Sequence, residues 1–440
     1  MIERGFRGFF RTVRRSNLPS CRLAVLPSVL PSCRPAVFLV LAACARTPAP
    51  GPLFPAALCS GPPCALDVLT RQLDSAIAAG AAPGAVLGVS SRGARYLYGA
   101  GRLARDDATR PDGHSIYDLA SLTKVIATTT LAMIAVSEGR LDLDAPVQRY
   151  LPEFRGQGKE RVTIRHLLTH SSGLPAHRPT WLQSPARDSA LGLVIGTPLD
   201  TVPGARMVYS DLGAIVLGEV LQRVHHGSLD RLARKEIFDR LHMSSTGFRP
   251  AERLLPRIAA TEYDSTWRHR MVRGQVHDEN AAWLGGVSGH AGLFGSALDL
   301  MTFGEWLLKT VGRSDGMTVG NFPDLGDHLP SYRLSVLPSI AREFIRRQEL
   351  VPGSSRALGW DTPSNGSSAG HRLSPESFGH TGFTGTSIWV DPTRQLVVVL
   401  LTNRVHPTRN NPRIGPLRVL VADRVVELLD GKPAASGLLP

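Results

Sequence analysis

Three short groups of polar residues in this 440-residue chain have the types and the order that acyl-transfer chemistry needs. The first is Ser121-Leu-Thr-Lys124, in which a serine and a lysine lie three residues apart. On a helix, residues at this spacing share a face, so the Lys124 amine can lie beside the Ser121 hydroxyl. A lysine that burial keeps neutral can take the proton of a serine and turn it into a nucleophile. The sequence therefore indicates Ser121 as a nucleophile and Lys124 as its activator.

The residues that follow this motif predict a buried helix. Val125–Ser137 is apolar almost all round, as in a helix that lies between two layers. Free N–H groups at the start of such a helix favour negative charge on the serine and on a tetrahedral intermediate. An S-x-x-K sequence turns up about once by chance in a chain of this length, but this one is the only example in a lysine-poor chain.

The second group is Tyr209-Ser-Asp211, in a loop before the predicted helix Leu212–Val224. A phenol that points at the serine can relay a proton to a leaving group. The Asp211 carboxylate can hold Lys124 or the substrate by hydrogen bonds. The ordinary alternative is a helix cap, and the two roles are compatible.

The third group is His380-Thr-Gly382, just ahead of a predicted strand at Gly385–Asp391. A glycine here lets a substrate backbone approach closely. His380 and Thr381 have groups that can bind a carboxylate or the reacting carbonyl region. The ordinary alternative for this group is a turn at the edge of a sheet.

In this order, the three groups resemble those of the serine β-lactamase and penicillin-binding protein superfamily. The likeness is to the class C β-lactamase and D,D-peptidase branch, and it covers about 65–430. Thr163–Leu174 and Gly379–Pro392 are similar to stretches of that branch, and Gly274–Ala281 and Leu284–Phe294 are similar to cell-wall amidase-like serine hydrolases.

The resemblance implies that Ser121 is acylated and that Lys124 and Tyr209 share the general base and general acid work. Which of the two is the base stays open. The backbone N–H groups of Ser121 and Phe383 are then expected to form the oxyanion hole. The residues that the resemblance assigns to substrate binding or to the oxyanion hole are Asp211, His380, Thr381, Gly382 and Phe383.

Two residues depart from the pattern of the family. Asp211 stands where Asn is usual, and it either keeps Lys124 protonated or is itself protonated. His380 stands where β-lactamases carry Lys, so we expect carboxylate binding to weaken as the pH rises past the imidazole pKa of ~6.5. The second departure favours a peptidase, an amidase or an esterase over a dedicated β-lactamase.

No cofactor and no metal is expected. His277, Asp278 and Glu279 are consecutive potential ligands, but they lack a helical i, i+4 histidine pair, and the family resembled needs no metal. We expect these residues to shape a loop of the cleft, and His290 to line it.

The N-terminal segment predicts export. A basic stretch precedes a short apolar run, Ala36–Ala43, and Leu41-Ala-Ala-Cys44 resembles a bacterial lipobox. All five cysteines lie before residue 65, which suits an oxidising compartment. We expect a signal peptide at 1–44, lipidation at Cys44, a Pro/Gly-rich tether at 45–64, and a periplasmic or extracytoplasmic, membrane-anchored lipoprotein. The alternative is an ordinary cleaved signal with a coincidental cysteine.

The formal charge of +13 does not indicate a nucleic-acid partner. Residues 1–43 account for +6 of it, with seven arginines against one acidic residue, and the rest of the chain has no basic run and no zinc-finger or RNA-recognition motif. The expected partners are a small-molecule or peptide substrate, such as cell-wall fragments or β-lactams, and a membrane through the lipid anchor.

The pattern of the remaining chain predicts an α+β fold. A hairpin at 84–99 follows a helix at 66–79, and a hairpin at 385–403 precedes a helix at 417–429. We expect 65–115 and 346–432 to form an antiparallel sheet domain flanked by N- and C-terminal helices. The segment 116–345 is expected to be a large, mainly helical domain that carries the nucleophile helix.

Together these observations predict an exported serine hydrolase that cleaves amide or ester bonds through an acyl-enzyme on Ser121, in peptidoglycan-derived peptides or muropeptides. The alternatives are a carboxylesterase, a weak β-lactamase, or a non-catalytic lipoprotein that binds penicillin or cell-wall peptides.

Overall fold

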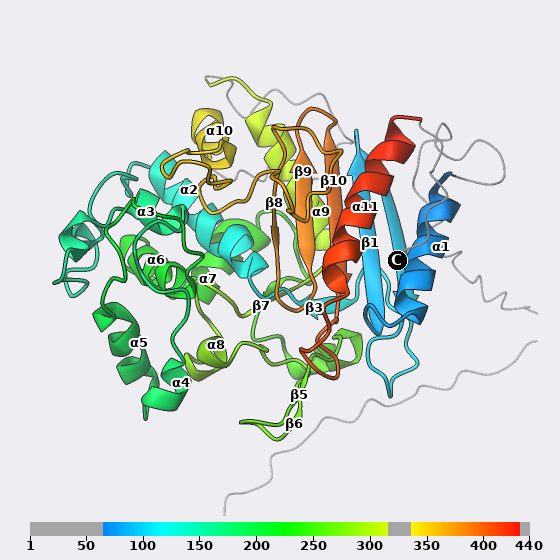
Figure 1. The fold of residues 1–440 in the computed structure, drawn as a ribbon, viewed down its shortest axis with the longest axis horizontal. Coiled ribbons are helices and arrows are strands. Elements are labelled where there is room, and N and C mark those ends of the chain that lie inside the picture. Colours follow the sequence, from blue (N-terminus) through cyan, green and yellow to red (C-terminus); the bar gives the residue numbers. More distant parts are fainter. Residues whose placement is uncertain (1–64, 316–335, 432–440) are drawn as a thin grey trace, which may run out of the picture. The chain divides into compact units, whose positions relative to one another are not determined.

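Five antiparallel strands form the main sheet, in the order β2-β1-β10-β9-β8 (Figure 1). The computed structural model describes residues 65–315 and 336–431, so the predicted signal, the tether and Cys44 lie outside the described residues. The strands are β1 (Gly84–Ser91), β2 (Ala94–Gly101), β8 (Phe378–Thr381), β9 (Ser387–Asp391) and β10 (Leu396–Thr402). The central pair, β1 and β10, joins segments from near the two ends of the described chain, with Leu87 opposite Leu400.

Helices cover both faces of this sheet. Every residue of β1, β9 and β10 is buried, which explains why these strands appear in the sequence as apolar runs without alternation. On one face lie α1 (Ala65–Ala78) and α11 (Ile414–Leu429), the blue and red helices of Figure 1. Leu73, Leu400 and Val425 pack together between these helices and the sheet.

The opposite face is covered by α9 (Ala297–Val311), which approaches the strands closely. A Cβ atom added to Gly304 would lie 2.6 Å from Val397 Cγ1, and one added to Gly88 would lie 2.7 Å from Met301 Sδ. Glycine at these two positions therefore lets the helix and the sheet come together.

The other described elements lie mainly between the two hairpins in the sequence. The strands are β3 (Ile116–Asp118), β4 (Gly247–Phe248), β5 (Tyr263–Asp264), β6 (Arg270–Met271) and β7 (Leu293–Ser296). The helices are α2 (Thr130–Ser137), α3 (Ile164–Leu168), α4 (Thr180–Gln183), α5 (Arg187–Gly196), α6 (Asp211–Val224), α7 (Leu229–Ala233), α8 (Glu279–Trp283) and α10 (Pro338–Ile345). There are also π-helical turns at Lys124–Thr129 and Arg234–Phe238, and 3-10 turns at Val147–Arg149, Lys159–Arg161 and Glu252–Arg257. Within residues 65–315 and 336–431, no helix combines the length and the apolar character that crossing a bilayer requires.

The predicted α+β class, with an antiparallel sheet between terminal helices, is confirmed. The division into a sheet domain and a helical domain stays a prediction. Helix α9 belongs to the segment 116–345, yet it packs against the sheet. One strand of the main sheet was not predicted: His380 lies in β8, at the edge of this sheet. This strand has only four residues, too few for a pattern of alternation to stand out.

Candidate active site

Ser121 lies in a tight turn between β3 and the buried helix. The residue before it, Ala120, has a left-handed backbone with φ of 47°. The buried Asp118 holds this turn, because its Oδ1 accepts a hydrogen bond of 2.9 Å from the Ala120 N–H. Its Oδ2 accepts one of 2.6 Å from the His277 N–H and so joins the turn to a distant loop. The chain then enters the π-helical turn at Lys124, a local widening often found at functional sites.

The Lys124 amine is buried and has three oxygen neighbours. Nζ donates to Ser121 Oγ at 3.0 Å and to the His290 carbonyl at 3.1 Å. It also lies 2.8 Å from Asp211 Oδ1. An ammonium group has three N–H donors, so this environment satisfies its charged form completely.

Lys124 and Asp211 are held as an ion pair. Burial lowers the pKa of Lys124, but the Asp211 carboxylate and the Tyr209 phenol raise it by more, and the net pKa lies above its ordinary value. Burial raises the pKa of Asp211, whereas Lys124 and then His177 lower it to a net value well below the ordinary range. Of the two roles expected for Asp211, the structure supports the one that keeps Lys124 protonated. The neutral lysine expected from burial alone is therefore not the resting form.

Tyr209 is positioned by the start of α6. Ser210 caps this helix, since its Oγ accepts a hydrogen bond from the Gly213 N–H at 3.1 Å. The capping role and the placement of Tyr209 thus coexist, as the sequence allowed. Nζ of Lys124 lies 4.9 Å from the centre of the Tyr209 ring. The Tyr209 hydroxyl is buried and has no hydrogen-bond partner among the described residues.

The surroundings of His380 favour its neutral form, so the expected weakening of carboxylate binding would begin at a lower pH than ~6.5. Its Nδ1 lies 2.8 Å from the Thr381 carbonyl oxygen, which can only accept, so Nδ1 carries the proton. Burial, followed by the charges of Arg356 and Lys124, lowers the pKa of His380 well below its ordinary value. Its Nε2 is buried without a partner in the described part of the chain and is available as an acceptor.

The loop after His380 is docked onto the turn that carries the nucleophile. Thr384 Oγ1 donates to the Asp118 carbonyl at 2.7 Å, and Thr386 Oγ1 donates to the Leu119 carbonyl at 3.0 Å. A Cβ atom at Gly382 would lie 2.1 Å from Thr386 Oγ1. Close packing of the two segments therefore requires glycine at this position.

Two backbone donors belong to residues that line this region and have no hydrogen-bond partner in the described part of the chain. Neither the Ser121 N–H nor the Phe383 N–H donates a hydrogen bond to another group of the described residues. Both residues line the same cavity. A pair of free N–H groups beside a serine hydroxyl is the arrangement that stabilises the oxyanion of a tetrahedral intermediate.

The cavity at Ser121 has a volume of about 370 Å³. Six of the predicted site residues line it, and the other two join it through contacts, since Lys124 contacts Ser121 and Asp211 contacts Lys124. The full lining is Ser121, Tyr209, Arg356, Asp361, His380, Thr381, Gly382, Phe383, Trp389, Arg404 and Arg418. The structure thus gathers every predicted site residue except Cys44, which lies outside the described residues.

Comparison with known proteins identifies the family. The family model described as Beta-lactamase matches residues 69–423. The chain belongs to the β-lactamase family. The relatives and the family are serine hydrolases, so this β-lactamase-family protein is a serine hydrolase as well.

Two curated relatives carry the same printed name, "Putative D-alanyl-D-alanine carboxypeptidase". The protein from Salmonella agona (strain SL483) is 32% identical over 333 residues, which span 69% of this chain and 72% of the relative. The protein from Salmonella typhi is 31% identical over 337 residues, which span 70% and 73%.

Solved structures confirm the β-lactamase-family fold. The β-lactamase/D-alanine carboxypeptidase from Pseudomonas syringae superposes with a TM-score of 0.63 at 19% identity, over 84% of this chain and 100% of that one. The octameric penicillin-binding protein homologue from Pyrococcus abyssi gives 0.62 at 20% identity, over 83% and 78%.

Sequence reasoning missed the basic side chains of this β-lactamase-family site. Arg356, Arg404 and Arg418 line the cavity, and each comes from a segment without a motif around it. The side chain of Arg356 is 12% exposed, and its Nε and Nη1 have no hydrogen-bond partner among the described residues. Its nearest carboxylate oxygen, Asp361 Oδ2, is 4.0 Å away.

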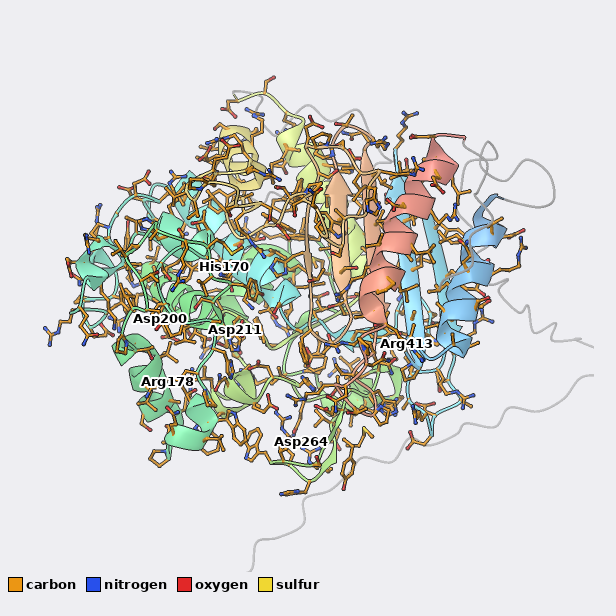
Figure 2. The ribbon with its side chains drawn as sticks, viewed as in Figure 1. His170, Arg178, Asp200, Asp211, Asp264 and Arg413 are labelled. Carbon is orange, nitrogen blue, oxygen red and sulfur yellow. The ribbon has the colours of Figure 1, made fainter. Side chains whose placement is uncertain are left out.

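His170 was also missed as a site residue. Its ring centre lies 4.4 Å from that of Tyr209, and its Nδ1 accepts a hydrogen bond from the Ser210 N–H at 3.1 Å. Figure 2 shows it near Asp211 on the helical side of the molecule. His170 lies within the stretch Thr163–Leu174, whose similarity to the family could have pointed to it as a site residue.

His277, Asp278 and Glu279 have separate protein partners. Asp278 Oδ1 lies 2.8 Å from His290 Nε2, and the His290 carbonyl accepts a hydrogen bond from Lys124. His290 was expected to line the cleft, but it is not among the residues that line the cavity at Ser121. The other two contacts are His277 Nε2 to Glu262 Oε2 at 2.8 Å and Glu279 Oε1 to Arg409 Nη2 at 2.6 Å. Within the described ranges, no group of three or more potential ligands is placed to hold a metal ion.

Proposed function

We propose that this serine hydrolase is a D,D-carboxypeptidase-type enzyme of the cell envelope, which removes a terminal residue with a free carboxylate from peptidoglycan-derived peptides. The observation that carries the proposal is Arg356, which lines the cavity of Ser121 and whose buried Nε and Nη1 have no hydrogen-bond partner among the described residues. A largely buried cation whose nearest carboxylate oxygen, on Asp361, is 4.0 Å away favours a carboxylate as its ligand. The names of the Salmonella relatives support the same substrate class.

The reaction would proceed through an acyl-enzyme. Ser121 Oγ attacks the carbonyl carbon of the scissile peptide, and its proton passes to Lys124 or Tyr209. The carbonyl oxygen takes up the negative charge and is held by the N–H groups of Ser121 and Phe383. The C–N bond breaks as Tyr209 or Lys124 returns a proton to the leaving amine. Water then hydrolyses the ester on Ser121.

Protonation of Lys124 shapes this step. Because Asp211 raises the pKa of Lys124, only a fraction of the enzyme has a neutral amine that can accept the serine proton, and this fraction grows with pH. We therefore expect acylation by the free enzyme to accelerate towards alkaline pH.

Two matched peptides test the proposed substrate. Diacetyl-L-lysyl-D-alanyl-D-alanine presents a free carboxylate, and its C-terminal amide does not. We expect wild type to release D-alanine from the acid, and Ser121→Ala to release none. In Arg356→Met the KM for the acid should rise about 10- to 100-fold, the usual value of a hydrogen bond to a charged group.

The control for Arg356→Met is Arg346→Met, since the exposed Arg346 pairs with Glu343 on the surface. A wild type that cleaves the amide as well as the acid would contradict the carboxypeptidase assignment. Equal turnover by wild type and Ser121→Ala would contradict the nucleophile. A nitrophenyl ester and a chromogenic cephalosporin, run in parallel, report on the esterase and β-lactamase alternatives.

Export and anchoring are a separate part of the proposal. The apolar run Ala36–Ala43 followed by Cys44 supports a lipid anchor at that cysteine. We expect the full chain to fractionate with membranes and Cys44→Ala to be released. Wild type that remains in the soluble cell fraction would contradict the anchor.

A further inference from the structure

Arg418 reaches from α11 into the catalytic region and holds the loop that follows β8. Its Nη2 donates to the Gly382 carbonyl and to the Thr386 carbonyl, both at 2.7 Å. The Gly382 N–H in turn donates to the Thr386 carbonyl at 2.8 Å. One guanidinium thus binds both carbonyls at the base of the loop that carries Phe383.

This arginine is partly buried and has no counterion among the described residues. No carboxylate pairs with it among the described residues, and its Nε has no hydrogen-bond partner there. By contrast, Arg268, which is also partly buried, lies 3.4 Å from an Asp264 carboxylate oxygen. Burial, followed by the charge of Arg404, lowers the pKa of Arg418 to about 9, which still leaves it charged at neutral pH. Even partial burial of an unpaired charge costs free energy, so a purely structural role is a poor explanation for it.

The position of the charge suggests what it does. The Gly382 carbonyl and the Phe383 N–H belong to the same peptide group, so a cation on this oxygen draws electron density from the nitrogen. Hydrogen bonds in a chain polarise one another in this way. Arg404 differs, because its Nε donates at 2.8 Å to the Phe383 carbonyl, which belongs to the next peptide group.

We propose that Arg418 is a positioning residue for the oxyanion hole, which orients the Phe383 N–H and strengthens it as a donor through the Gly382 carbonyl. The inference rests on the proposed acyl-enzyme function of Ser121. As Ser121 Oγ bonds to the substrate carbonyl carbon, the π electrons of that carbonyl move to its oxygen, and the polarised N–H meets this charge. The effect is therefore larger in the tetrahedral state than in the bound substrate.

The test compares Arg418→Met and Arg418→Lys with wild type in the full chain. We expect Arg418→Met to lower kcat about 10- to 100-fold with KM within about twofold, somewhat less than the loss of a whole oxyanion donor. Arg418→Lys, which keeps the charge, should recover part of kcat. Arg413→Ala is the control, because this exposed residue at the foot of α11 (Figure 2) lies outside the cavity lining.

The affinity for a boronic acid would not change if Arg418 had only a structural role. Phenylboronic acid bonds to Ser121 Oγ and forms a tetrahedral anion without turnover. Its affinity should fall in Arg418→Met by the same factor as kcat/KM. The proposal would be overturned if Arg418→Met bound the boronate as tightly as wild type. It would also be overturned if kcat, KM and the thermal midpoint all became worse together.

Failure of the proposed function would look different. If the carboxypeptidase assignment is wrong, wild type fails to release D-alanine from the peptide, yet boronate still binds Ser121 and still reports the effect of Arg418. If wild type binds no boronate at Ser121, the oxyanion hole itself is absent and the role of Arg418 is refuted with it.

Discussion

Nζ of Lys124 lies 2.8 Å from Oδ1 of Asp211. This contact favours the protonated form of the group that touches the nucleophile, because burial lowers the pKa of the amine but the carboxylate, together with the Tyr209 phenol, raises it by more. Asp211, which departs from the family pattern, therefore acts on the Lys124 amine beside Ser121.

Asp211→Asn should make Lys124 a base at lower pH. Without the carboxylate, the main contact that opposes the effect of burial is lost, and the pKa of the Lys124 amine falls. An opposite charge at this distance typically accounts for about one to three pH units, so the acidic limb of kcat/KM should move to lower pH by about that amount. The measurement is the pH profile of peptide hydrolysis for both proteins.

The control for this shift is Asp200→Asn, the same change at an exposed position (Figure 2), which should leave the profile in place. A limb that stays in place or moves to higher pH in Asp211→Asn would show that Lys124 is not the proton acceptor, and would assign the role to Tyr209.

Tyr209→Phe should separate activity from stability. The hydroxyl is buried and makes no hydrogen bond within the described residues, so its removal leaves no other group unpaired and should not lower the free energy of unfolding. The ring contacts with His170 and Lys124 remain. If the hydroxyl relays a proton, kcat should fall about 10²- to 10⁴-fold. Kinetics and urea unfolding of the same sample check both halves, and a stability loss that accompanies unchanged kcat would reverse the interpretation.

The parts of the site that depend on short-range geometry could be predicted from the sequence. Ser121 and Lys124 are three residues apart, and the helical spacing that brings them together is realised as a 3.0 Å contact. The central strands could be predicted as well, because continuous apolar runs bounded by turns leave few other structures.

The remaining features depend on contacts between distant segments. Arg356 and Arg418 reach the cavity from separate parts of the fold. No local sequence motif distinguishes an arginine with such a role from other arginines in loops or helices. The neutral form of His380 likewise depends on its burial and on the approach of Arg356. A charge state that neighbours determine cannot be predicted from a three-residue motif.

The same neutral histidines should make stability depend on pH. Burial, as the largest cause, lowers the pKa of both His170 and His380 well below 6.5 in the folded protein. Below about pH 6.5 the unfolded chain therefore binds protons that the folded protein does not. The free energy of unfolding should fall as the pH drops from 7.5 to 5.5, by up to about 1.4 kcal/mol per pH unit for each such histidine.

Urea unfolding of wild type and of His380→Gln across this range isolates one of the two groups. The slope of the free energy of unfolding against pH should be smaller in His380→Gln by the contribution of one proton. His269→Gln, a change at an exposed position, should leave this slope unchanged. Parallel slopes for wild type and His380→Gln would mean that His380 is protonated in the folded protein.

Gly382→Ala should displace the oxyanion loop. The new Cβ would lie 2.1 Å from Thr386 Oγ1 and 2.4 Å from the Leu119 carbonyl oxygen, and neither contact is tolerable, so the loop must move away from the turn that carries Ser121. Loss of one oxyanion donor costs about 10²- to 10³-fold in kcat, and we expect a fall in this range. Gly192→Ala is the matched control, because its Cβ meets nothing within 4 Å in the interior of α5. That change should stabilise the protein by up to about 1 kcal/mol and leave kcat alone. Wild-type kcat in Gly382→Ala would show that the contact between the loop and the turn does not set the geometry of the reaction.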